Sequence, residues 1–309
     1  MRPMNGILNI RKEPGWTSHD VVAKLRRILG QKRIGHTGTL DPDAEGVLPV
    51  CLGKATRAAD MLTDQTKTYE AVLLLGVETD TQDAGGKILD RREVVCTPEE
   101  LSECVHSFLG EQLQIPPMYS ALKKDGKKLY ELAREGKTVE REPRKVRFYE
   151  ITLLETDFPR AKIRVTCSKG TYIRTLCSDI GARLGCKACM EHLVRTRSGG
   201  FALEDSRTVS QVEALAGEGR LGEILYPVDW IFREYPAART EPEADRAAKN
   251  GNLLQESQFR WEGNPPGAGT ENLRLYDSAG VFLGLYRLHR GRKWIRPVKM
   301  FYDGQEQQT

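Results

Sequence analysis

The sequence predicts an α+β protein with a large first domain and a small β-rich second one, and three observations support this prediction. Amphipathic helices and alternating strands follow one another in irregular order, strands occur in hairpin-like pairs, and no dinucleotide-binding motif is present. This order argues against a doubly wound parallel sheet. The chain has 309 residues, of which 39% are hydrophobic and 29% charged, which is enough for such an arrangement.

Two segments carry the signals of an amphipathic helix. From Ser18, which can cap the first turn, apolar residues recur at helical spacing as far as Gly30. A second helix is expected to begin after Thr97 with a capping box that includes Glu100 and to end at Gly110, with the apolar positions as far as residue 109 facing inward.

Strands and a third helix follow in the same domain. Strands are expected over residues 69–75, 147–154 and 161–167. The last of these alternates cleanly between apolar and polar residues, and Thr171 then opens a helix. Arg174 therefore lies in the first turn of that helix, off its apolar face.

The character of the chain changes after about Asp229 and Trp230. Residues 235–250 are charged and helix-like, and short strands are expected at 272–276, 281–287 and 294–298. This pattern predicts a small β-rich module over 233–309. The module could bind a ligand or could only pack on the core.

Asp41 is the residue that we expect to carry chemistry. It lies in a loop, residues 35–46, whose three glycines let the backbone approach a ligand closely, while Pro42 favours extended backbone at Asp41. The apolar run 47–52 anchors this loop on the core, as reactive groups are usually mounted. An ordinary Asp-Pro turn has the same local signals, so the loop alone leaves both interpretations open.

A family resemblance decides between them. The string GHTGTLDPDAEGVLPVCLGKATR, residues 35–57, resembles the active-site motif of the TruB family of tRNA pseudouridine synthases. Similar motifs follow the family's order along the chain, with IRKEPGWTS at 10–18, KTY at 67–69, PPMYSALK at 116–123 and SKGTYIR at 168–174. Arg11 and Glu13 depart from the family's usual Asp and Pro, whereas Lys12 is in place.

This resemblance implies a fold and a domain plan. The first domain, 1–232, is expected to hold a mixed, mostly antiparallel central sheet with flanking helices and a catalytic cleft along it. A basic RNA-gripping insertion is expected at about 116–147. The β-rich module, 233–309, resembles the RNA-binding PUA-type domain found in many members of the family.

The implied activity is isomerisation of uridine to pseudouridine at position 55 in the TΨC loop of tRNA, after the base is flipped out of the RNA. The reaction breaks the N1–C1′ bond, rotates the base, joins C5 to C1′ and removes the C5 proton. Because it involves no oxidation and no net hydrolysis, we expect no cofactor and no metal. Asp41 could act as a nucleophile or could promote loss of a ribose proton, and both routes remain open.

The resemblance also implies roles for individual residues. Asp41 is implied to be the catalytic aspartate, with Arg174 as its cationic partner. Tyr69 is implied to be a catalytic tyrosine that stacks on the target base and handles a proton late in the reaction. His36 is implied to contact the displaced nucleotides. The other implied substrate-binding positions are Lys12, Lys67, Tyr172 and Leu193.

The insertion is also unusual in its charge. Residues 116–147 carry ten Lys or Arg and five Asp or Glu, a net charge of +5, which exceeds the +4 of the whole chain. Met118, Tyr119 and Tyr130 lie between these cations, a composition that suits unstacked bases and phosphates. A solvated helix over 129–134 with charged flanks is the alternative. In the context of the other motifs we expect RNA contact from Lys123, Lys124, Lys127 and Lys128.

One cysteine cluster could indicate a metal or redox site. Cys186 and Cys189 precede His192, but a zinc site needs four ligands. The nearest other thiols, Cys167 and Cys177, lie in an expected strand and an expected helix. We therefore expect no metal here.

The remaining expectations concern compartment and partners. Seven cysteines without a dense framework predict reduced thiols in a cytoplasm, and no apolar run approaches the ~20 residues of a membrane span. The insertion resembles that of stand-alone family members, which implies a monomer that acts on tRNA without an obligatory protein partner. Two rival hypotheses are a guide-RNA-dependent enzyme and a non-catalytic protein that binds or folds RNA.

Overall fold

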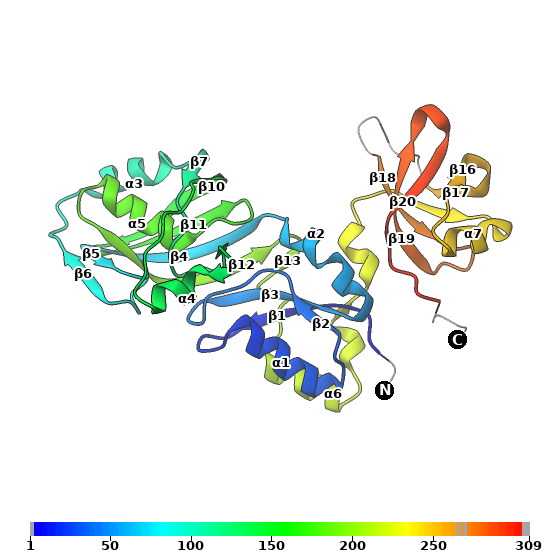
Figure 1. Ribbon diagram of the computed structural model, residues 1–309, viewed down its shortest axis with the longest axis horizontal. Helices are drawn as coiled ribbons and strands as arrows, with labels where there is room; N and C mark the ends of the chain where they lie inside the picture. Colours follow the sequence, from blue (N-terminus) through cyan, green and yellow to red (C-terminus); the bar gives the residue numbers. More distant parts are fainter. Residues whose placement is uncertain (1–2, 264, 266, 268–270, 305–309) are drawn as a thin grey trace.

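The computed structural model describes residues 3–263, 265, 267 and 271–304. Two β-sheets dominate it. The larger is formed by strands between residues 6 and 226, and the smaller by strands between 237 and 300 (Figure 1). The chain passes from one to the other through the 3-10 helix η3 (Val228–Phe232), so the boundary expected at 232/233 falls at the end of this connection.

The larger sheet is mixed and mostly antiparallel, as predicted. In the described part of the chain its main path runs β14-β1-β3-β12-β4-β11-β10-β7, while β2 pairs with β3 and β13 pairs with β12. Among these pairs only β3 and β12 run parallel. The strands of this sheet are β1 (Gly6–Lys12), β2 (Ile34–His36), β3 (Glu45–Leu52), β4 (Lys67–Leu75), β7 (Gly110–Gln114), β10 (Arg144–Asp157), β11 (Arg160–Cys167), β12 (Ala188–Ser198), β13 (Phe201–Ala202) and β14 (Leu225–Tyr226).

Two short hairpins stand outside this sheet. One joins β5 (Val77–Thr79) to β6 (Ile88–Arg91), and the other, within the insertion, joins β8 (Lys123–Lys124) to β9 (Lys127–Lys128). Figure 1 shows the first hairpin at the end of the molecule farthest from the smaller sheet.

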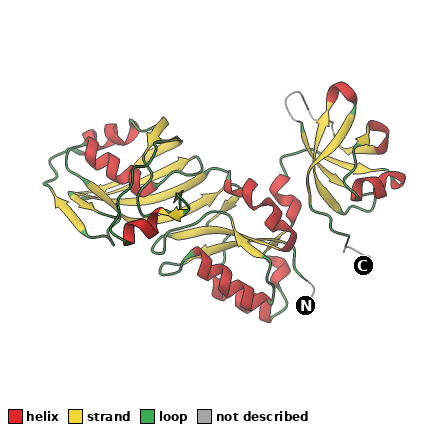
Figure 2. Cartoon of the chain, in the orientation of Figure 1, coloured by secondary structure: helices red, strands yellow, loops and turns green. Residues whose placement is uncertain are grey.

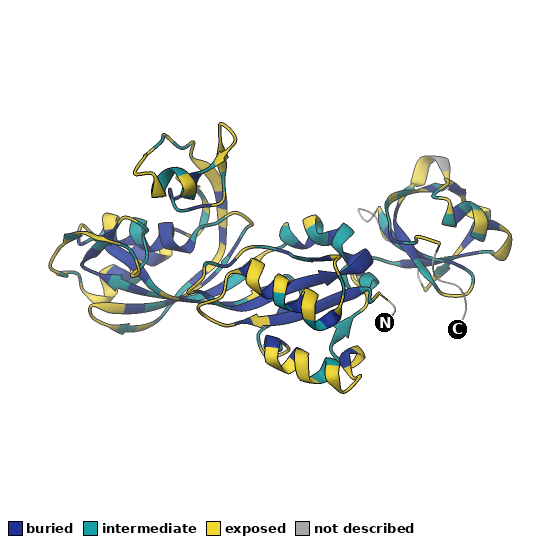
Figure 3. Ribbon diagram, turned by 60° about the horizontal axis from the view of Figure 1, so that its bottom comes forward, coloured by how far each residue is buried: buried dark blue, intermediate teal, exposed yellow. Residues whose placement is uncertain are grey.

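Helices cover the two ends of the larger sheet, as Figure 2 shows in red. One apolar core lies beneath α1 and α6, and a second lies beneath α3 and α5. Figure 3 shows that these helices present exposed residues to solvent over buried strands. The longer helices are α1 (Ser18–Leu29), α3 (Pro98–His106), α5 (Ile173–Arg183) and α6 (Val209–Gly217), and the shorter ones are α2 (Ala59–Thr63), α4 (Leu129–Arg134) and α7 (Asp245–Lys249). None of the described helices is long and apolar enough to cross a bilayer.

The predicted helices are present, but some of their first and last residues differ from the prediction. Helix α1 ends at Gly30 as predicted, yet Thr17 caps it, because the buried Ser18 hydroxyl bonds the backbone of Leu40 instead. Helix α3 has the predicted capping box but ends at His106, since the chain turns so that Gly110 can begin β7. Leu109, expected to face inward, is 54% exposed.

The strand predictions are confirmed at 69–75, 147–154, 161–167 and the three C-terminal sites, and each observed strand overlaps its predicted range. Strand β12 escaped prediction because a fully buried arginine, Arg195, breaks its apolar pattern. The helix-like interpretation of 235–250 is wrong over Ala237–Thr240, which form strand β15. There, pairing with two neighbouring strands overrides the local helical preference.

The smaller domain is β-rich with its own core. Its strands follow the order β16-β20-β19-β18-β15-β17 around buried leucines and a buried tyrosine. The remaining strands are β16 (Leu254–Gln255), β17 (Phe259–Glu262), β18 (Asn272–Tyr276), β19 (Phe282–His289) and β20 (Trp294–Met300), and the remaining 3-10 helices are η1 (Gly53–Ala58), η2 (Leu221–Glu223), η4 (Pro242–Ala244), η5 (Glu256–Gln258) and η6 (Arg290–Arg292).

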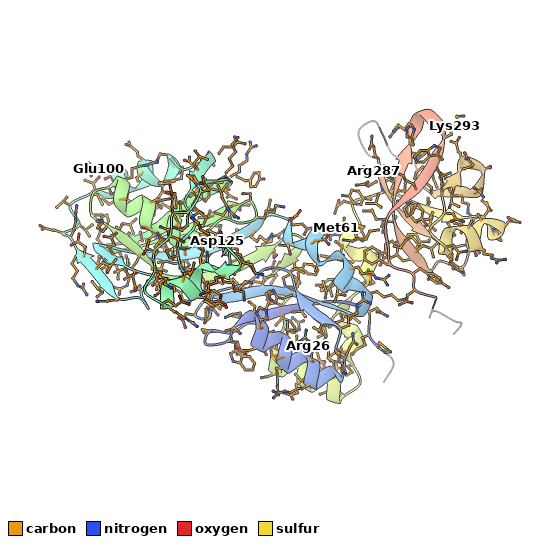
Figure 4. The ribbon with its side chains drawn as sticks, in the orientation of Figure 1. Arg26, Met61, Glu100, Asp125, Arg287 and Lys293 are labelled. Atoms are coloured by element: carbon orange, nitrogen blue, oxygen red, sulfur yellow. The ribbon has the colours of Figure 1, made fainter. Side chains whose placement is uncertain are left out.

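An apolar contact joins the two domains. Ala58 of the first domain packs with Phe232, Leu285 and Phe301, with Met61, labelled in Figure 4, at its edge. Polar contacts add to it, including the 2.7 Å ion pair of Lys299 with Asp60.

A substitution at Gly46 tests whether the close approach of β3 and β12 requires a glycine at this position. Its φ is +109°, and a Cβ atom there would lie 2.3 Å from the carbonyl oxygen of Arg195. We expect Gly46→Ala to lower the free energy of unfolding by at least about 2 kcal/mol in urea titrations, because it adds backbone strain to an overlap that backbone atoms must relieve. Gly217→Ala, at an open helix end, should change it by less than about 1 kcal/mol. Equal midpoints for wild type and Gly46→Ala would contradict this account.

Candidate active site

A buried lysine, Lys12, donates hydrogen bonds to the backbone of the loop that carries Asp41. Lys12 is 0% exposed, and its Nζ donates to the carbonyls of Pro42 at 2.8 Å, Ala44 at 2.6 Å and Glu13 at 3.1 Å. Burial lowers the pKa of Lys12 to about 8, and the charge of Asp43 opposes this shift. The amine therefore stays charged at neutral pH. Lys12 was expected to contact RNA, but here its donors hold the loop.

The same loop is fixed at two further points. The Ser18 hydroxyl accepts from the Leu40 amide at 3.0 Å. Arg195, which is 1% exposed, donates to the carbonyls of Gly38 at 3.1 Å and Val47 at 2.7 Å. The loop backbone thus uses partners on β1, α1 and β12.

Asp41 and Arg174 come together as the sequence motifs implied. The Arg174 Nε lies 3.0 Å from Oδ2 of Asp41, and its Nη2 lies 3.2 Å from Oδ1. This is a bidentate pair, the strong geometry for arginine and carboxylate. The Arg174 side chain is 5% exposed and that of Asp41 is 40% exposed, so the carboxylate faces the open side and the guanidinium lies behind it.

Arg174 is held by three other groups. Its Nη1 donates to the Thr81 carbonyl at 3.0 Å, and its Nη2 donates to the Tyr119 carbonyl at 2.8 Å. Asp83 approaches Nη1 at 3.7 Å, and burial raises the pKa of this second carboxyl. A buried guanidinium is stable only when its donors are used, so these groups fix its position.

Tyr69 lies in the floor of the site. On β4 it pairs with Val165 on one side and Arg195 on the other, and it is packed in the same core as Leu40. Burial raises the pKa of its phenol, and the charge of Arg195 opposes that rise. The phenol is therefore neutral at neutral pH. Leu193, buried and opposite Ala71, shares the face of the sheet that carries Tyr69.

Tyr172 is positioned through its main chain. The Gln114 side chain donates to the Tyr172 carbonyl at 3.0 Å and accepts from its amide at 2.8 Å. The ring is half-buried just before α5, and burial raises the pKa of its phenol while the Ser120 hydroxyl opposes the rise. A neutral hydroxyl therefore lies near the Asp41–Arg174 pair.

His36 ends strand β2 at the rim of the loop. Its ring makes an edge contact with His19, with centroids 5.1 Å apart. Burial, followed by the charges of His19 and Arg195, lowers the pKa of His36 to about 4. The ring is therefore neutral, and its buried Nδ1 has no hydrogen-bond partner within the described residues.

The expected RNA-binding lysines fall into two groups. Lys67 is buried, and its amine donates to the carbonyls of Thr63 and Gln65, so it holds a turn, which differs from the expected RNA contact. The insertion lysines, in contrast, lie on the β8–β9 hairpin, whose turn residue Asp125 is labelled in Figure 4. Three of these, Lys123, Lys124 and Lys127, are exposed, and Lys128 is half-buried.

An aromatic residue accompanies these lysines. The Lys128 Nζ lies 5.3 Å from the centre of the Tyr130 ring, and Arg134 lies 5.4 Å from it on helix α4. Met118, which we expected beside the cations, is instead buried.

Several residues of the site were not predicted from the sequence. Arg195 and Asp83 carried no local signal, because an arginine in a strand and an aspartate in a turn are ordinary surface residues by pattern. In the sequence Tyr119 stands out only as an aromatic residue, whereas in the structure its carbonyl accepts from Arg174.

The cysteine cluster shows no metal geometry. Cys186 and Cys189 are buried free thiols. Within the residues that the structure describes, no group of three or more His, Cys, Asp or Glu is placed to hold a metal ion.

Comparison with known families matches most of the first domain. Residues 26–173 match the model of the TruB family pseudouridylate synthase (N terminal domain), and residues 174–233 match that of the tRNA pseudouridylate synthase B C-terminal domain.

Curated relatives match over nearly the whole chain. A protein of Lachnoclostridium phytofermentans named tRNA pseudouridine synthase B is 48% identical over 96% of this chain and 100% of its own length. One of the same name from Alkaliphilus oremlandii is 50% identical over 97% of this chain and 99% of its own length.

Solved structures share the fold. A chain in the structure of an H/ACA RNP bound to a substrate RNA containing 2′-deoxyuridine is 25% identical, with a TM-score of 0.72 over 97% of this chain and 86% of its own. A chain from a Cbf5-Nop10-Gar1 complex is 27% identical, with a TM-score of 0.71 over 96% of this chain and 84% of its own.

Burial lowers the pKa of His36 to about 4, which predicts that the folded protein loses stability in acid. Between pH 6.5 and about 4 the unfolded chain binds a proton that folded His36 does not, so stability falls as the pH falls through this window. We expect His36→Gln to lose less stability than wild type between pH 7 and 4.5 in thermal unfolding. The exposed His106→Gln should follow wild type, and parallel losses in all three proteins would contradict the assignment.

Proposed function

Because the chain belongs to the TruB family of pseudouridylate synthases, we propose that it converts one uridine of the TΨC loop of tRNA, at position 55, into pseudouridine with Asp41 as the catalytic residue. The observation that carries this proposal is the bidentate pair of Asp41 with the buried Arg174. The carboxylate must stay ionised when the substrate removes water from it, and a fixed guanidinium supplies the opposing charge.

The first step takes place at the sugar. Asp41 acts near C1′ of the flipped nucleotide, either as a nucleophile or by promoting loss of a ribose proton. Cleavage of the N1–C1′ bond then frees the base, which rotates and is joined to C1′ through C5, and loss of the C5 proton completes the reaction. The proton lost from C5 is balanced by one taken up at N1, so no atom is gained or lost overall. Besides the action of Asp41 at the sugar, the residues of this chain have to hold and orient the base and exchange protons.

Aromatic side chains hold the base during this sequence. Tyr69 in the floor and Tyr172 at the start of α5 offer neutral rings on which a uracil can stack. Leu193 contributes an apolar wall beside Tyr69. His36, neutral and at the rim, suits contact with the nucleotides displaced when the target leaves its stack.

Binding of the folded RNA is assigned to other surfaces. The exposed lysines of the β8–β9 hairpin face solvent and suit phosphate contacts, which hold RNA by shape and backbone. The β-rich C-terminal domain has the size and position of a PUA-like module, which we propose as a second RNA contact. Lys12 and Lys67 have no such role, because their amines bond main-chain carbonyls.

We further propose that the enzyme acts as a monomer without a guide RNA or a partner protein. Its identity to the relatives named tRNA pseudouridine synthase B is 48 to 50% over nearly full length. Its identity is 25% to the chain from the H/ACA RNP and 27% to the chain from the Cbf5-Nop10-Gar1 complex. The stand-alone mode is therefore favoured over the guide-dependent one.

Asp41→Asn tests the catalytic assignment. Using a tRNA transcript with tritium at C5 of uridine, we expect tritium release to fall by at least about 10³-fold, because the reacting group is removed. RNA affinity should stay within about threefold, because phosphate contacts supply most of it. Asp43→Asn, two residues away and exposed, is the matched control and should retain nearly full activity. Tritium release by Asp41→Asn at the wild-type rate would assign the chemistry to another group.

Replacing Lys123, Lys124, Lys127 and Lys128 together by Gln tests the insertion. We expect weaker tRNA binding. In a plot of log Kd against log salt concentration, we expect the slope to be smaller by roughly 0.7 to 0.9 for each phosphate that these lysines no longer neutralise. The same four residues replaced by Arg keep the charge and should keep the slope. If the Gln and Arg variants share the wild-type slope, this hairpin does not contact phosphate.

A further inference from the structure

Arg195 is a buried cation without a counterion in the protein. Its side chain is 1% exposed, and no carboxylate among the residues that the structure describes forms an ion pair with it. Its main-chain acceptors, the carbonyls of Val47 and Gly38, carry no net charge. Because arginine keeps its proton and a buried charge without a counterion is costly, this cation calls for an explanation. An RNA phosphate does not reach a side chain buried to this extent.

The contacts of this cation lead to Tyr69. The bonds to Val47 and Gly38 use Nε and Nη2, and neither of them uses Nη1. Tyr69 lies directly opposite Arg195 where strands β4 and β12 pair. Burial raises the pKa of the Tyr69 phenol, whereas the charge of Arg195 and a side-chain hydrogen bond from it oppose the rise. One guanidinium therefore connects the Asp41 loop to the phenol of Tyr69.

The positive charge of Arg195 favours negative charge on the groups around it. Burial, followed by this charge, lowers the pKa of Lys67 to about 8. Such interactions are screened less inside a protein than in water. A hydrogen bond from a cation to an anion is also roughly twice as strong as one between neutral groups. Arg195 therefore stabilises a phenolate at Tyr69 more than it stabilises the neutral phenol.

We propose that Arg195 is a positioning residue of the reaction, which holds the Tyr69 oxygen in place and supplies its counterion while Tyr69 transfers protons. This inference rests on the proposed function and on the proton transfer that the family resemblance implies for Tyr69. In the reaction N1 gains one proton and C5 loses one. Tyr69 gives its phenolic proton to N1 and then, as a phenolate bonded to Arg195, takes the proton from C5, which restores the phenol.

The test separates the C5 step from the chemistry at the sugar. Single-turnover rates of pseudouridine formation are measured on T-arm RNA hairpins whose target is either uridine or uridine deuterated at C5. The proteins compared are wild type, Arg195→Gln, Arg195→Lys and Lys12→Met. Lys12 is the matched control, because it is also a buried cation that donates to carbonyls of the Asp41 loop, but its hydrogen bonds do not include Tyr69.

We expect Arg195→Gln to slow the reaction of uridine about 10²-fold, which is the lower end of the contribution of a proton-transferring group. Deuterium at C5 should slow this variant further and more than it slows wild type, because proton removal from C5 then limits the rate. Arg195→Lys keeps a cation and should lose less activity than Arg195→Gln. Lys12→Met should show equal rates on the two substrates, because it disturbs the loop of Asp41, which acts before the C5 step.

Tyr69→Phe tests the contact itself in a protein that keeps Arg195. This change removes the phenol oxygen and leaves a buried guanidinium donor without its acceptor. The midpoint of urea unfolding should therefore fall below that of wild type. Tyr149→Phe, at a tyrosine that is exposed, should keep the wild-type midpoint. This measurement decides the contact even if the variants at Arg195 do not fold.

Other outcomes would overturn the inference. If Arg195→Gln reacts equally fast with both substrates, or if Lys12→Met shows as large a deuterium effect, Arg195 is only a structural support of the loop. An unchanged midpoint for Tyr69→Phe would contradict the contact between Arg195 and the phenol. If wild type forms no pseudouridine from the uridine hairpin, the proposed function itself fails and the inference fails with it.

Discussion

The ion pair between Arg174 and Asp41 is the contact on which the arrangement of the site depends. Arg174 is nearly fully buried, and an arginine cannot lose its proton at any ordinary pH. Its guanidinium must therefore find acceptors for its donors within the protein. It finds them on segments that are far apart in the sequence, which are the Asp41 loop, the turn that contains Thr81 and the root of the insertion at Tyr119. The buried guanidinium of Arg174 thus holds these three segments together at the candidate site.

The loop that carries Asp41 is shaped by its neighbours more than by its own residues. Lys12 from β1 and Arg195 from β12 donate to main-chain carbonyls of this loop, so they fix its backbone without engaging the Asp41 carboxylate. The close approach of β3 and β12 at Gly46 brings Arg195 into reach. A carboxylate that moves little on a loop can meet a reacting carbon without a large loss of conformational entropy.

The exposed cations suited to RNA lie on the insertion, whereas the aromatic rings of the candidate active site are neutral. Around Asp41 the rings of Tyr69, Tyr172 and His36 are neutral, because burial disfavours their charged forms. The exposed cations of the β8–β9 hairpin lie on the insertion, where water screens them and where RNA phosphates can replace that water. Because the root of this insertion bonds Arg174, the surface suited to RNA is continuous with the Asp41–Arg174 pair.

Local signals along the chain were enough to locate most regular elements, and sequence motifs were enough to select the residues of the candidate site. Capping residues and apolar spacing located α1, α3 and the strands through 161–167, and motifs implied that Asp41, Tyr69 and Arg174 belong to one site. Packing between distant segments determined which cations are buried and which segments pair as strands, and the local sequence pattern does not encode either. Lys12 and Arg195 look like surface cations but are buried, and Ala237–Thr240 look helical but pair as a strand. The reason is physical, since burial of a charge and choice of a strand partner depend on groups brought from distant parts of the chain.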